Sequence, residues 1–260
     1  MKKIITLVAM AMFVVGMTSC QKKNVVVINS AADLAGKKIG CQAGTTGELY
    51  VQESVENAKL KSFKTGIDAS LDLKNGAIDA IVLDELPAKE IVSRNPDLMI
   101  VNDNFMTESY AIAVKKGNTQ LLDSVNKTIA QLKESGKYEE LIKAFMPVDG
   151  NIVIPEIEDV DSKDVVKMGT NASFPPFEFI MGTDVVGFDV SMGKFIAKDY
   201  GKKLKVIDMA FDGLIAALQS GAIDFIAAGM TATEERRQNV DFSESYYESN
   251  QVIIVRKTAE

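Results

Sequence analysis

The pattern of apolar and polar residues occurs twice along the chain in the same order. Residues 204–228 contain a short apolar run, a helical pattern that ends at Gly221, and a second apolar run. Residues 60–83 repeat this order, with Gly76 in the place of Gly221. Glycine is common just after a helix, because it adopts the left-handed conformation at little cost. Each copy therefore predicts a strand, a short helix closed by glycine, and a second strand.

A third strand candidate opens each half of the chain, at residues 37–41 and 165–169. Apolar runs that alternate with helices are typical of parallel sheets with helices on both faces. Chance similarity between two βαβ units is the alternative, but the flanking strands also match. The sequence therefore predicts an α/β protein with two similar lobes, each a mostly parallel sheet flanked by helices.

Two further segments lie between the repeats. Amphipathic patterns over residues 119–145 predict two helices, with a break near Ser135 and Gly136. Residues 147–164 are acidic, lack periodicity, and contain two prolines and a glycine that interrupt regular structure. We interpret this second segment as a surface linker.

The first 20 residues have the composition of an export signal. Lys2 and Lys3 precede an apolar run over residues 4–17, and small residues lead to Cys20. The run is shorter than the about 20 residues of a membrane-spanning helix. Its end resembles a bacterial lipoprotein cleavage box, which predicts a lipid on Cys20 and an exported cell-envelope lipoprotein, periplasmic or on the outer face of the membrane. The alternative is an ordinary signal peptide in which Cys20 has no role.

Composition excludes several classes of function. The chain of 260 residues has 29 basic and 36 acidic side chains, for a formal charge of −7, and no block rich in lysine and arginine. This charge argues against nucleic acid as a partner. The absence of histidine excludes a Ser-His-Asp triad and histidine-containing zinc sites, and two cysteines are too few for an all-cysteine zinc site. We therefore expect no metal and no cofactor. With a lipid on Cys20, Cys41 would have no partner for a disulfide.

Ligands of an open parallel sheet bind beyond the carboxyl ends of the strands, so the residues after each strand are the candidates. After the strand at 225–228, Thr231 and Glu234 predict a capping box at the start of a helix. Arg236 follows, and a helix start beside a guanidinium suits a carboxylate. A capped surface helix with a solvated Arg236 is the alternative.

Two strands of the other half also end in candidate residues. A small-residue loop at 42–47 leads into a predicted helix over 48–59 and offers a second anion cradle; a plain strand-to-helix turn is the alternative. The loop lacks the Gly-Lys-Ser/Thr end of a nucleotide-binding loop, which argues against nucleotides. Asp84 follows the strand at 80–83 and either caps the next helix or receives a cation.

Aromatic residues complete the set of candidates. Phe174 lies in a loop stiffened by Pro175 and Pro176, and Phe211 follows the strand around 206–207. Both rings either close the core or face a ligand. A guanidinium for an anion, a carboxylate for a cation and rings between them outline a site for a zwitterion. An α-amino acid leaves water at low cost only when both of its charges find partners.

The candidate residues lie within a series of longer motifs, at residues 36–47, 80–84, 169–179, 186–189, 208–215, 230–236 and 240–247. Together the motifs resemble those of polar amino-acid-binding proteins that serve bacterial ABC importers, over nearly all of residues 30–260. The resemblance implies the type 2 periplasmic-binding-protein fold, in which two lobes close around a ligand, and no catalytic activity.

The order of the motifs differs from the order in that family, where the first lobe comes first and the chain crosses to the second lobe and returns. We interpret the rotated order as a circular permutation, which close surface termini tolerate. The expected domains are a signal peptide at 1–20, lobe 2 at 25–109, a return hinge strand and helices on lobe 1 at 110–146, a linker of the ancestral ends at 147–164, and lobe 1 with the outgoing hinge strand at 165–260. A lobe-swapped dimer is the alternative to the expected monomer.

The resemblance implies a role for each candidate residue. Arg236 would hold the α-carboxylate, helped by the backbone N–H groups of Thr231 and Thr46, and Asp84 would accept the α-amino group. The remaining candidates surround the side chain: Phe174 and Phe211 flank it, Gly229 and Gln42 line the site, and Asn171 lies near its end. The expected ligand is a free polar amino acid, Gln or Arg among them. The expected partners are an importer permease and, through the lipid, the membrane.

Two other functions use the same scaffold. A dehydratase-like enzyme would use carboxylates near the cleft, such as Glu178 and Asp189, but the contacts at Arg236 and Asp84 favour binding. A ligand-sensing module for a membrane receptor is the second alternative.

Overall fold

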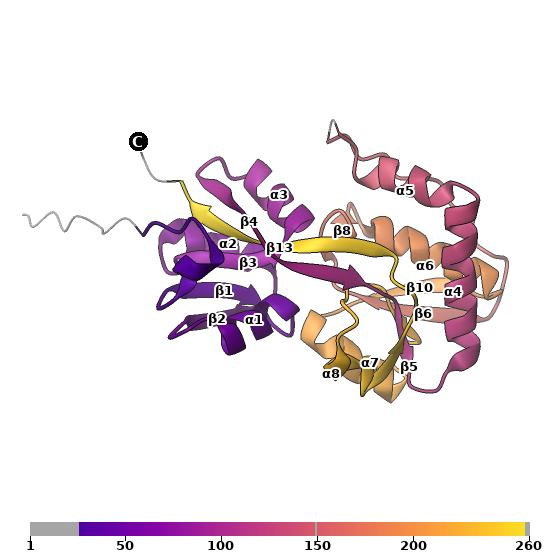
Figure 1. Cartoon of the computed structure of the whole chain (residues 1–260). Helices are drawn as coiled ribbons and strands as arrows, with labels where there is room; N and C mark the ends of the chain where they lie inside the picture. Colours follow the sequence, from indigo (N-terminus) through magenta and orange to yellow (C-terminus); the bar gives the residue numbers. More distant parts are fainter. Residues whose placement is uncertain (1–25, 149, 258–260) are drawn as a thin grey trace, which may run out of the picture.

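Two lobes connected by a pair of long strands form the computed structural model, which describes residues 26–148 and 150–257 (Figure 1). Strand β4 (Leu98–Tyr110) and strand β13 (Tyr247–Arg256) pair antiparallel and run from one lobe to the other. The predicted signal peptide and Cys20 lie outside the described residues. Within the described part of the chain, no helix is long and apolar enough to cross a membrane.

Lobe 2 contains a five-stranded sheet in the order β2-β1-β3-β13-β4. The first three strands are parallel neighbours, whereas β13 runs antiparallel to β3 and to β4. All the strands except β13 therefore point the same way. The other elements of lobe 2 are η1 (Ala31–Leu34), β1 (Lys38–Gln42), α1 (Thr46–Ser54), β2 (Lys59–Phe63), α2 (Gly66–Asn75), β3 (Ala80–Asp84) and α3 (Glu85–Ser93).

Lobe 1 contains a second five-stranded sheet, in the order β10-β6-β11-β5-β12, and a small sheet of β7, β8 and β9. The strands are β5 (Ala113–Lys115), β6 (Val165–Thr170), β7 (Ser173–Phe174), β8 (Glu178–Met181), β9 (Asp184–Val186), β10 (Lys203–Asp208), β11 (Phe225–Ile226) and β12 (Val240–Phe242). The helices are α4 (Thr119–Glu134), α5 (Lys137–Phe145), α6 (Phe188–Asp199), η2 (Phe211–Gly213), α7 (Leu214–Ser220) and α8 (Glu234–Arg237).

Both large sheets follow one plan, which confirms the predicted α/β fold with two similar lobes. In each sheet three parallel neighbours are followed by one antiparallel strand and an edge strand. The antiparallel strand comes from a distant part of the chain: β13 enters lobe 2 and β5 enters lobe 1. The repeated helices α2 and α7 end as predicted, at Gly76 and Gly221, whose φ angles of 76° and 79° are left-handed.

Some predicted boundaries are wrong. The helix predicted over 48–59 is α1, which begins at Thr46 and ends at Ser54. Val55 is extended and Asn57 is left-handed, with φ of 54°, so the chain leaves the helix before β2 begins. The strand predicted at 225–228 is shorter, and its regular part is Phe225–Ile226.

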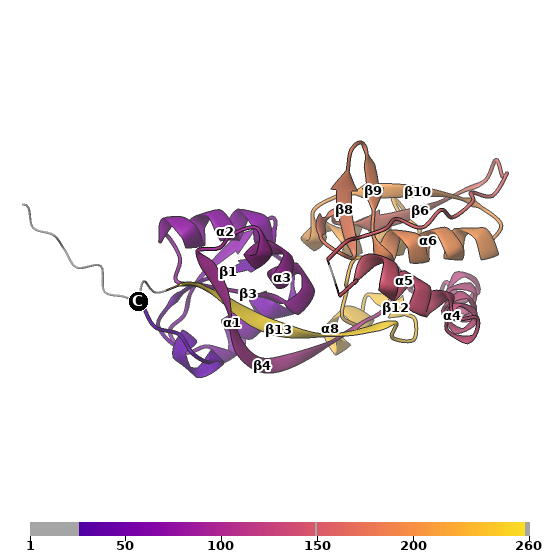
Figure 2. The same cartoon turned by 90° about the horizontal axis from the view of Figure 1, so that it is seen from above.

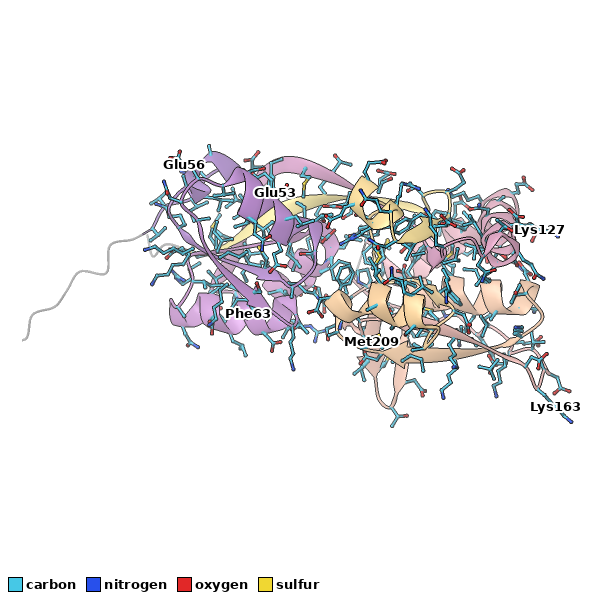
Figure 3. The ribbon with its side chains drawn as sticks, turned by 90° about the horizontal axis from the view of Figure 1, so that it is seen from below. Glu53, Glu56, Phe63, Lys127, Lys163 and Met209 are labelled. Atoms are coloured by element: carbon cyan, nitrogen blue, oxygen red, sulfur yellow. The ribbon has the colours of Figure 1, made fainter. Side chains whose placement is uncertain are left out.

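The segment 147–164 connects α5 to β6, two elements of lobe 1 (Figure 2). Its described residues form no helix or strand. Lys163 of this segment lies at the end of lobe 1 that is far from lobe 2, whereas Met209 lies near the junction of the lobes (Figure 3). The segment therefore runs away from the interlobe region.

An aromatic cluster lies where the crossing strands enter lobe 1. Tyr110, at the end of β4, is fully buried and packs edge-on against Phe177, with 5.2 Å between the ring centroids. Tyr247, at the start of β13, stacks on Tyr110 at 5.8 Å. These ring contacts fix the two crossing strands to lobe 1 at the point where the pocket described below begins.

Gly187, just before α6, supports a testable prediction about the loop that carries Phe174 and Glu178. Its φ is 142°, and an added Cβ would lie 2.0 Å from the carbonyl oxygen of Phe177. Gly187→Ala should therefore lower the free energy of unfolding by more than about 2 kcal/mol. Gly182→Ala is the control, because Gly182 has φ of 65° and no atom within 4 Å of an added Cβ. Equal losses in urea unfolding of the two variants would contradict the close contact at Gly187.

Candidate functional site

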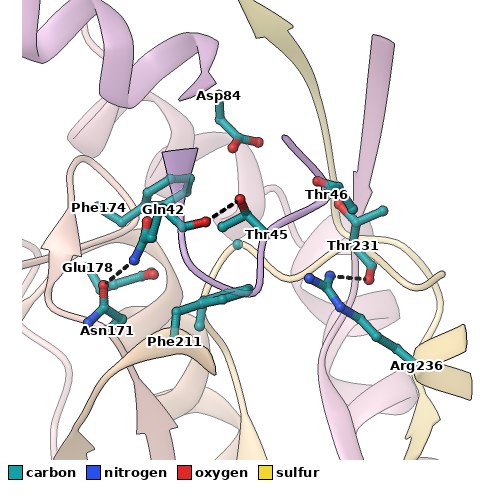
Figure 4. A pocket seen from close by; sticks show the side chains of 12 residues that line it. Gln42, Thr45, Thr46, Asp84, Asn171, Phe174, Glu178, Phe211, Thr231 and Arg236 are labelled. Carbon is teal, nitrogen blue, oxygen red and sulfur yellow. Dashed lines mark hydrogen bonds between the residues drawn. The ribbon is translucent and has the colours of Figure 1, made fainter. Parts of the chain in front are cut away.

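A pocket between the two lobes contains all nine predicted ligand-binding residues (Figure 4). The space between its side chains amounts to about 330 Å³, which includes solvent at its open side. Lobe 2 contributes Gln42, Thr45, Thr46 and Asp84, and lobe 1 contributes Asn171, Phe174, Glu178, Phe211, Ala228, Gly229, Thr231 and Arg236. The pocket lies at the carboxyl ends of β1, β3, β6 and β11, where open parallel sheets bind ligands.

Arg236 provides a buried positive charge on one side of the pocket. Its side chain comes from the short helix α8, and the residue is 8% exposed. The guanidinium donates from Nη1 to the Thr231 carbonyl oxygen and from Nη2 to the Gly44 carbonyl oxygen of the other lobe, both at 2.8 Å. It also lies over the Phe211 ring, 5.4 Å from the centroid. The alternative of a solvated Arg236 is therefore wrong.

The electrostatics of Arg236 favour an anionic ligand. None of the ion pairs in the described part of the chain involves Arg236. Burial lowers the pKa of its guanidinium, and the charges of Glu108 and Asp84 partly oppose this shift. A buried cation without a carboxylate in contact is stabilised by any anion that reaches it.

The predicted capping box at Thr231 and Glu234 is wrong. Helix α8 begins at Glu234, and its N-cap is Thr233, whose hydroxyl accepts from the Arg236 N–H at 3.2 Å. The Thr231 hydroxyl instead donates to the carboxylate of Glu108. The capping-box pattern fits Thr231 alone, but the helix begins later, after Thr233, whose backbone is extended.

Glu108, on β4, connects the two loops that face each other across the pocket. Besides Thr231 of lobe 1, it accepts from the hydroxyl of Thr46 in lobe 2 at 2.7 Å and from Gln251 Nε2 on β13 at 3.2 Å. The residue is 1% exposed. Glu108 therefore holds both loops against the crossing strands, and no local sequence pattern marked it.

Asp84 lies across the pocket from Arg236 (Figure 4). It occupies the N-cap position of α3, yet its side chain makes no capping hydrogen bond. The carboxylate instead accepts from the Tyr110 hydroxyl at 2.5 Å and from Gln251 Nε2 at 2.9 Å. Of the two roles that the sequence left open for Asp84, the structure therefore does not show capping of α3.

Burial raises the pKa of Asp84 to about 7, and the charge of Glu108 adds to the shift. The hydrogen bonds from Tyr110 and Gln251 act in the opposite direction. A positive group beside Asp84 would stabilise its charged form. The pocket thus contains a buried cation, Arg236, and a carboxyl group, Asp84, whose ionisation costs free energy unless a cation lies beside it.

The far end of the pocket is closed by amide groups from both lobes. Gln42 Nε2 donates to Asn171 Oδ1 at 2.9 Å and to the Lys64 carbonyl oxygen at 3.1 Å. Asn171 Nδ2 in turn donates to the Met209 carbonyl oxygen at 2.8 Å. Together with the bond from Arg236 to Gly44, the bond between Gln42 and Asn171 joins the two lobes directly.

The aromatic side chains border the space between the charges. Phe174 is 8% exposed, and Phe211 is half-buried. Phe174 also explains Gly229, because a Cβ at that position would lie 2.6 Å from the Phe174 ring. Gly229, with φ of 54°, lets the chain pass under the ring.

Glu178 and Asp189, the carboxylates considered for catalysis, occupy different places. Glu178 lines the pocket, whereas Asp189 does not and accepts from the Gly229 N–H at 2.9 Å and the Tyr246 hydroxyl at 2.6 Å. Both residues are fully buried. Burial first, and then the charge of Asp189, raises the pKa of Glu178 well above its ordinary value. Burial also raises the pKa of Asp189 to about 6.

Two α/β lobes enclose one pocket that carries buried groups of opposite charge. Residues 166–260 match a protein family described as bacterial extracellular solute-binding proteins, family 3. The match covers this segment alone, and there it supports the resemblance to binding proteins of ABC importers that the sequence predicts. The members are binding proteins and not enzymes.

Individual relatives match parts of the chain. The chain is 47% identical to the arginine-binding extracellular protein ArtP of Bacillus subtilis (strain 168) over 90 residues, which are 35% of this chain and 35% of the relative. The chain is 32% identical to the L-cystine-binding protein TcyJ of Escherichia coli (strain K12) over 130 residues, which are 50% of this chain and 49% of the relative. The solved arginine-bound form of domain 1 from TmArgBP is 42% identical, covers 39% of this chain and 87% of its own, and has a TM-score of 0.32. The chain thus spans about a third to a half of the length of these curated relatives.

Asp84 should leave a signature in the pH dependence of stability. Its pKa in the folded protein is about 7, above its ordinary value of 3.8, so between these values the folded state binds more protons than the unfolded state. Stability therefore falls as the pH rises from about 4 through 7. Asp84→Asn removes this loss and should be more stable than the wild type at pH 8 by at least about 1 kcal/mol.

Urea unfolding at pH 5 and pH 8 measures this effect. The gain from Asp84→Asn should be larger at pH 8 than at pH 5. Asp123→Asn, which changes an exposed acid on α4, is the control and should show the same small difference at both pH values. An Asp84→Asn variant less stable than the wild type at pH 8 would contradict the assignment.

Proposed function

We propose that the protein captures a free polar L-amino acid between its lobes and delivers it to an ABC importer. The observation that carries this proposal is the pairing of Arg236 and Asp84, two buried groups of opposite charge on opposite sides of one pocket. A free α-amino acid carries the two complementary charges a few ångströms apart. The match of residues 166–260 to extracellular solute-binding proteins supports the same function.

The α-carboxylate would bind Arg236 in a fork and take the place of the Gly44 carbonyl oxygen. The backbone N–H groups of Thr46, at the start of α1, and of Thr231 would add donors. Asp84 would accept the α-amino group, which favours the charged carboxylate. Each charge-assisted hydrogen bond contributes about 1.5–3 kcal/mol, enough together for roughly micromolar affinity.

Capture and release would follow from rotation of the lobes about β4 and β13. These two strands connect the lobes beside the pocket. Glu108 on β4 accepts hydrogen bonds from a loop of each lobe. Hinge closure around a ligand is a common motion of two-lobed proteins. Phe174, Phe211, Gly229, Gln42 and Asn171 would then surround the ligand side chain.

The cellular setting is part of the proposal. The predicted lipid on Cys20 would hold the protein at the membrane surface, where it meets the importer permease, and the protein would act as a monomer. The circular permutation would explain why segment 147–164 connects two elements of one lobe. Relatives named for arginine, histidine and cystine support a polar ligand, and Gln or Arg are the expected ones.

Substitution of the two charged residues tests the site. Arg236→Ala and Asp84→Ala should each weaken amino-acid binding at least about tenfold, on the order of 1.4 kcal/mol, because each leaves one charge of the ligand without a partner. Isothermal titration calorimetry measures the change. Arg237→Ala is the matched control, because the neighbouring Arg237 is exposed and its guanidinium lies over the Phe242 ring outside the pocket. Unchanged affinity in both pocket variants would remove this site assignment.

A thermal-shift screen of the twenty amino acids tests the ligand class. A ligand that binds only the folded state raises the unfolding temperature. Polar amino acids should give the largest shifts, and their α-keto acid analogues, which lack the amino group, should give much smaller ones. Shifts with sugars or metal ions alone would contradict the proposal.

A further inference from the structure

Gln251, on β13, bridges two buried acids that belong to two different strands. Its Nε2 donates to Asp84 Oδ2 at 2.9 Å and to Glu108 Oε1 at 3.2 Å. Gln251 is fully buried, and both acids are buried as well. A side-chain amide nitrogen has two hydrogens, so this one group satisfies an oxygen of each acid. Both N–H groups of Gln251 are therefore used on the acids.

The pairing of the strands brings the three side chains together. Gln251 lies opposite Asp84 of β3, and on its other side it lies opposite Met106 of β4, two residues before Glu108. Side chains of directly opposite residues point to the same face of a sheet, and so do side chains two residues apart. All three side chains therefore share one face, and Asp84 lines the pocket from it.

The two acids fix the direction of the Gln251 amide. In the reversed orientation, its carbonyl oxygen would lie against an oxygen of each acid, which is unfavourable for ionised acids because none of these atoms would be a donor. Instead Oε1 faces α1, where a Cβ added to Gly47 would lie 2.9 Å from it. Among the described residues, Oε1 has no hydrogen-bond partner. The amide is thus held at its nitrogen end, by the two acids.

Through Glu108, Gln251 connects the two ends of the site proposed above. Glu108 also accepts from the hydroxyls of Thr46 and Thr231. The backbone N–H groups of these threonines are the proposed donors to the α-carboxylate, and Asp84 is the proposed acceptor of the α-amino group. A chain of hydrogen bonds therefore leads from Asp84 through Gln251 and Glu108 to both threonine loops. Neither Gln251 nor Glu108 lines the pocket itself.

The contact with Gln251 also makes a negative charge on Asp84 less costly. Burial, and then the charge of Glu108, raise the pKa of Asp84 to about 7, whereas the hydrogen bonds from Tyr110 and Gln251 lower it. A donor that bonds to a carboxylate stabilises its charged form. The titratable groups that act on Asp84 from the elements around it are Glu108 and Tyr110 on β4, Glu178 on β8 and Arg236 on α8. Without the Gln251 donor, Asp84 would be protonated over a wider range of pH.

We propose that Gln251 is a positioning residue that holds Asp84 for the α-amino group of the ligand and connects this contact to the loops at the α-carboxylate. Its side chain acts through the two acids and does not touch the ligand. The inference rests on the proposed function. It adds a residue behind the pocket that determines how strongly an α-amino group is preferred over a neutral group in the same place.

Gln251→Met tests this role, because methionine is unbranched like glutamine and has no N–H group in its side chain. The probes are L-arginine and L-glutamine, or the amino acid with the largest thermal shift, each with the α-hydroxy analogue in which a hydroxyl replaces the α-amino group. At pH 7 the variant should bind the amino acids at least about tenfold more weakly and keep the affinity for the hydroxy analogues within about threefold. Direct and competition calorimetry measure both affinities. A residue that only supports the fold would weaken both ligands alike.

The pH profile is a second measurement on the same ligand pairs. In the wild type, the ratio of amino-acid to hydroxy-acid affinity should fall about tenfold from pH 8 to pH 6, because free Asp84 takes up a proton near its pKa of about 7. Gln251→Met raises this pKa, so the fall should begin at a higher pH and become larger, up to about a hundredfold. Both ligands of a pair have the same α-carboxylate and side chain, so effects on those parts cancel in the ratio.

Gln219→Met is the matched control. Gln219 is exposed on α7, and its Nε2 donates to Asn239 Oδ1 at 3.2 Å, outside the pocket. Its substitution removes an amide hydrogen bond and should leave both affinities unchanged. If thermal unfolding shows that Gln251→Met does not fold, Gly47→Ala takes its place, because the added Cβ presses on the Gln251 amide. Gly47→Ala should lower the affinity ratio at least about twofold.

The outcomes separate this inference from the proposed function. If the wild type binds no free amino acid, the proposed function is wrong and the inference falls with it. If the wild type binds an amino acid but Gln251→Met changes both ligands of a pair equally, or neither of them, the amino-acid site stands and the role of Gln251 is wrong. A pH profile of Gln251→Met that equals the wild-type profile would also overturn the inference.

Discussion

Burial of charge without a paired partner is the constraint on which the rest of the pocket depends. Arg236, Asp84 and Glu178 each lie in the interlobe pocket with little or no contact with water. Removing such groups from water is costly, and the cost appears as a lowered pKa for the guanidinium and raised pKa values for the two acids. Asp84 ends β3, Glu178 begins β8 and Arg236 lies in α8, so regular elements hold all three groups in place. The hydrogen bonds from Tyr110 and Gln251 offset only part of the cost at Asp84.

The crossing strands connect this constraint to the relative position of the two lobes. Tyr110 and Glu108 belong to β4 and Gln251 belongs to β13, and these residues bond to Asp84 and to loops of both lobes. The strands that join the lobes are thus also the layer behind the pocket. A rotation of one lobe must therefore change the contacts that hold Asp84 and Thr231, which couples the state of the pocket to the angle between the lobes.

The sequence predicts those parts of the site that follow from local rules. Gln42 and Asp84 were found because each lies at the end of a strand of a predicted parallel sheet, and strand ends meet at one edge. Arg236 was found because it lies in the helix that follows such a strand. Glu108 and Gln251 were missed because their importance comes from a pairing of strands over 140 residues apart, which no short pattern records. The capping prediction at Thr231 failed for a similar reason, since the Thr231 hydroxyl bonds to the distant Glu108 and Thr233 caps the helix.

The hydrogen bonds that join the lobes directly bear on which molecules can enter. Arg236 Nη2 donates to the Gly44 carbonyl oxygen at 2.8 Å, and Gln42 donates to Asn171 at 2.9 Å. Both acceptors are neutral, whereas a carboxylate adds its negative charge and can accept two parallel hydrogen bonds from one guanidinium. A carboxylate at Arg236 would therefore replace the Gly44 oxygen with a net gain, whereas a neutral acceptor would gain nothing from the exchange. In the proposed function this difference allows the lobes to hold together and still open for a ligand with an anionic group.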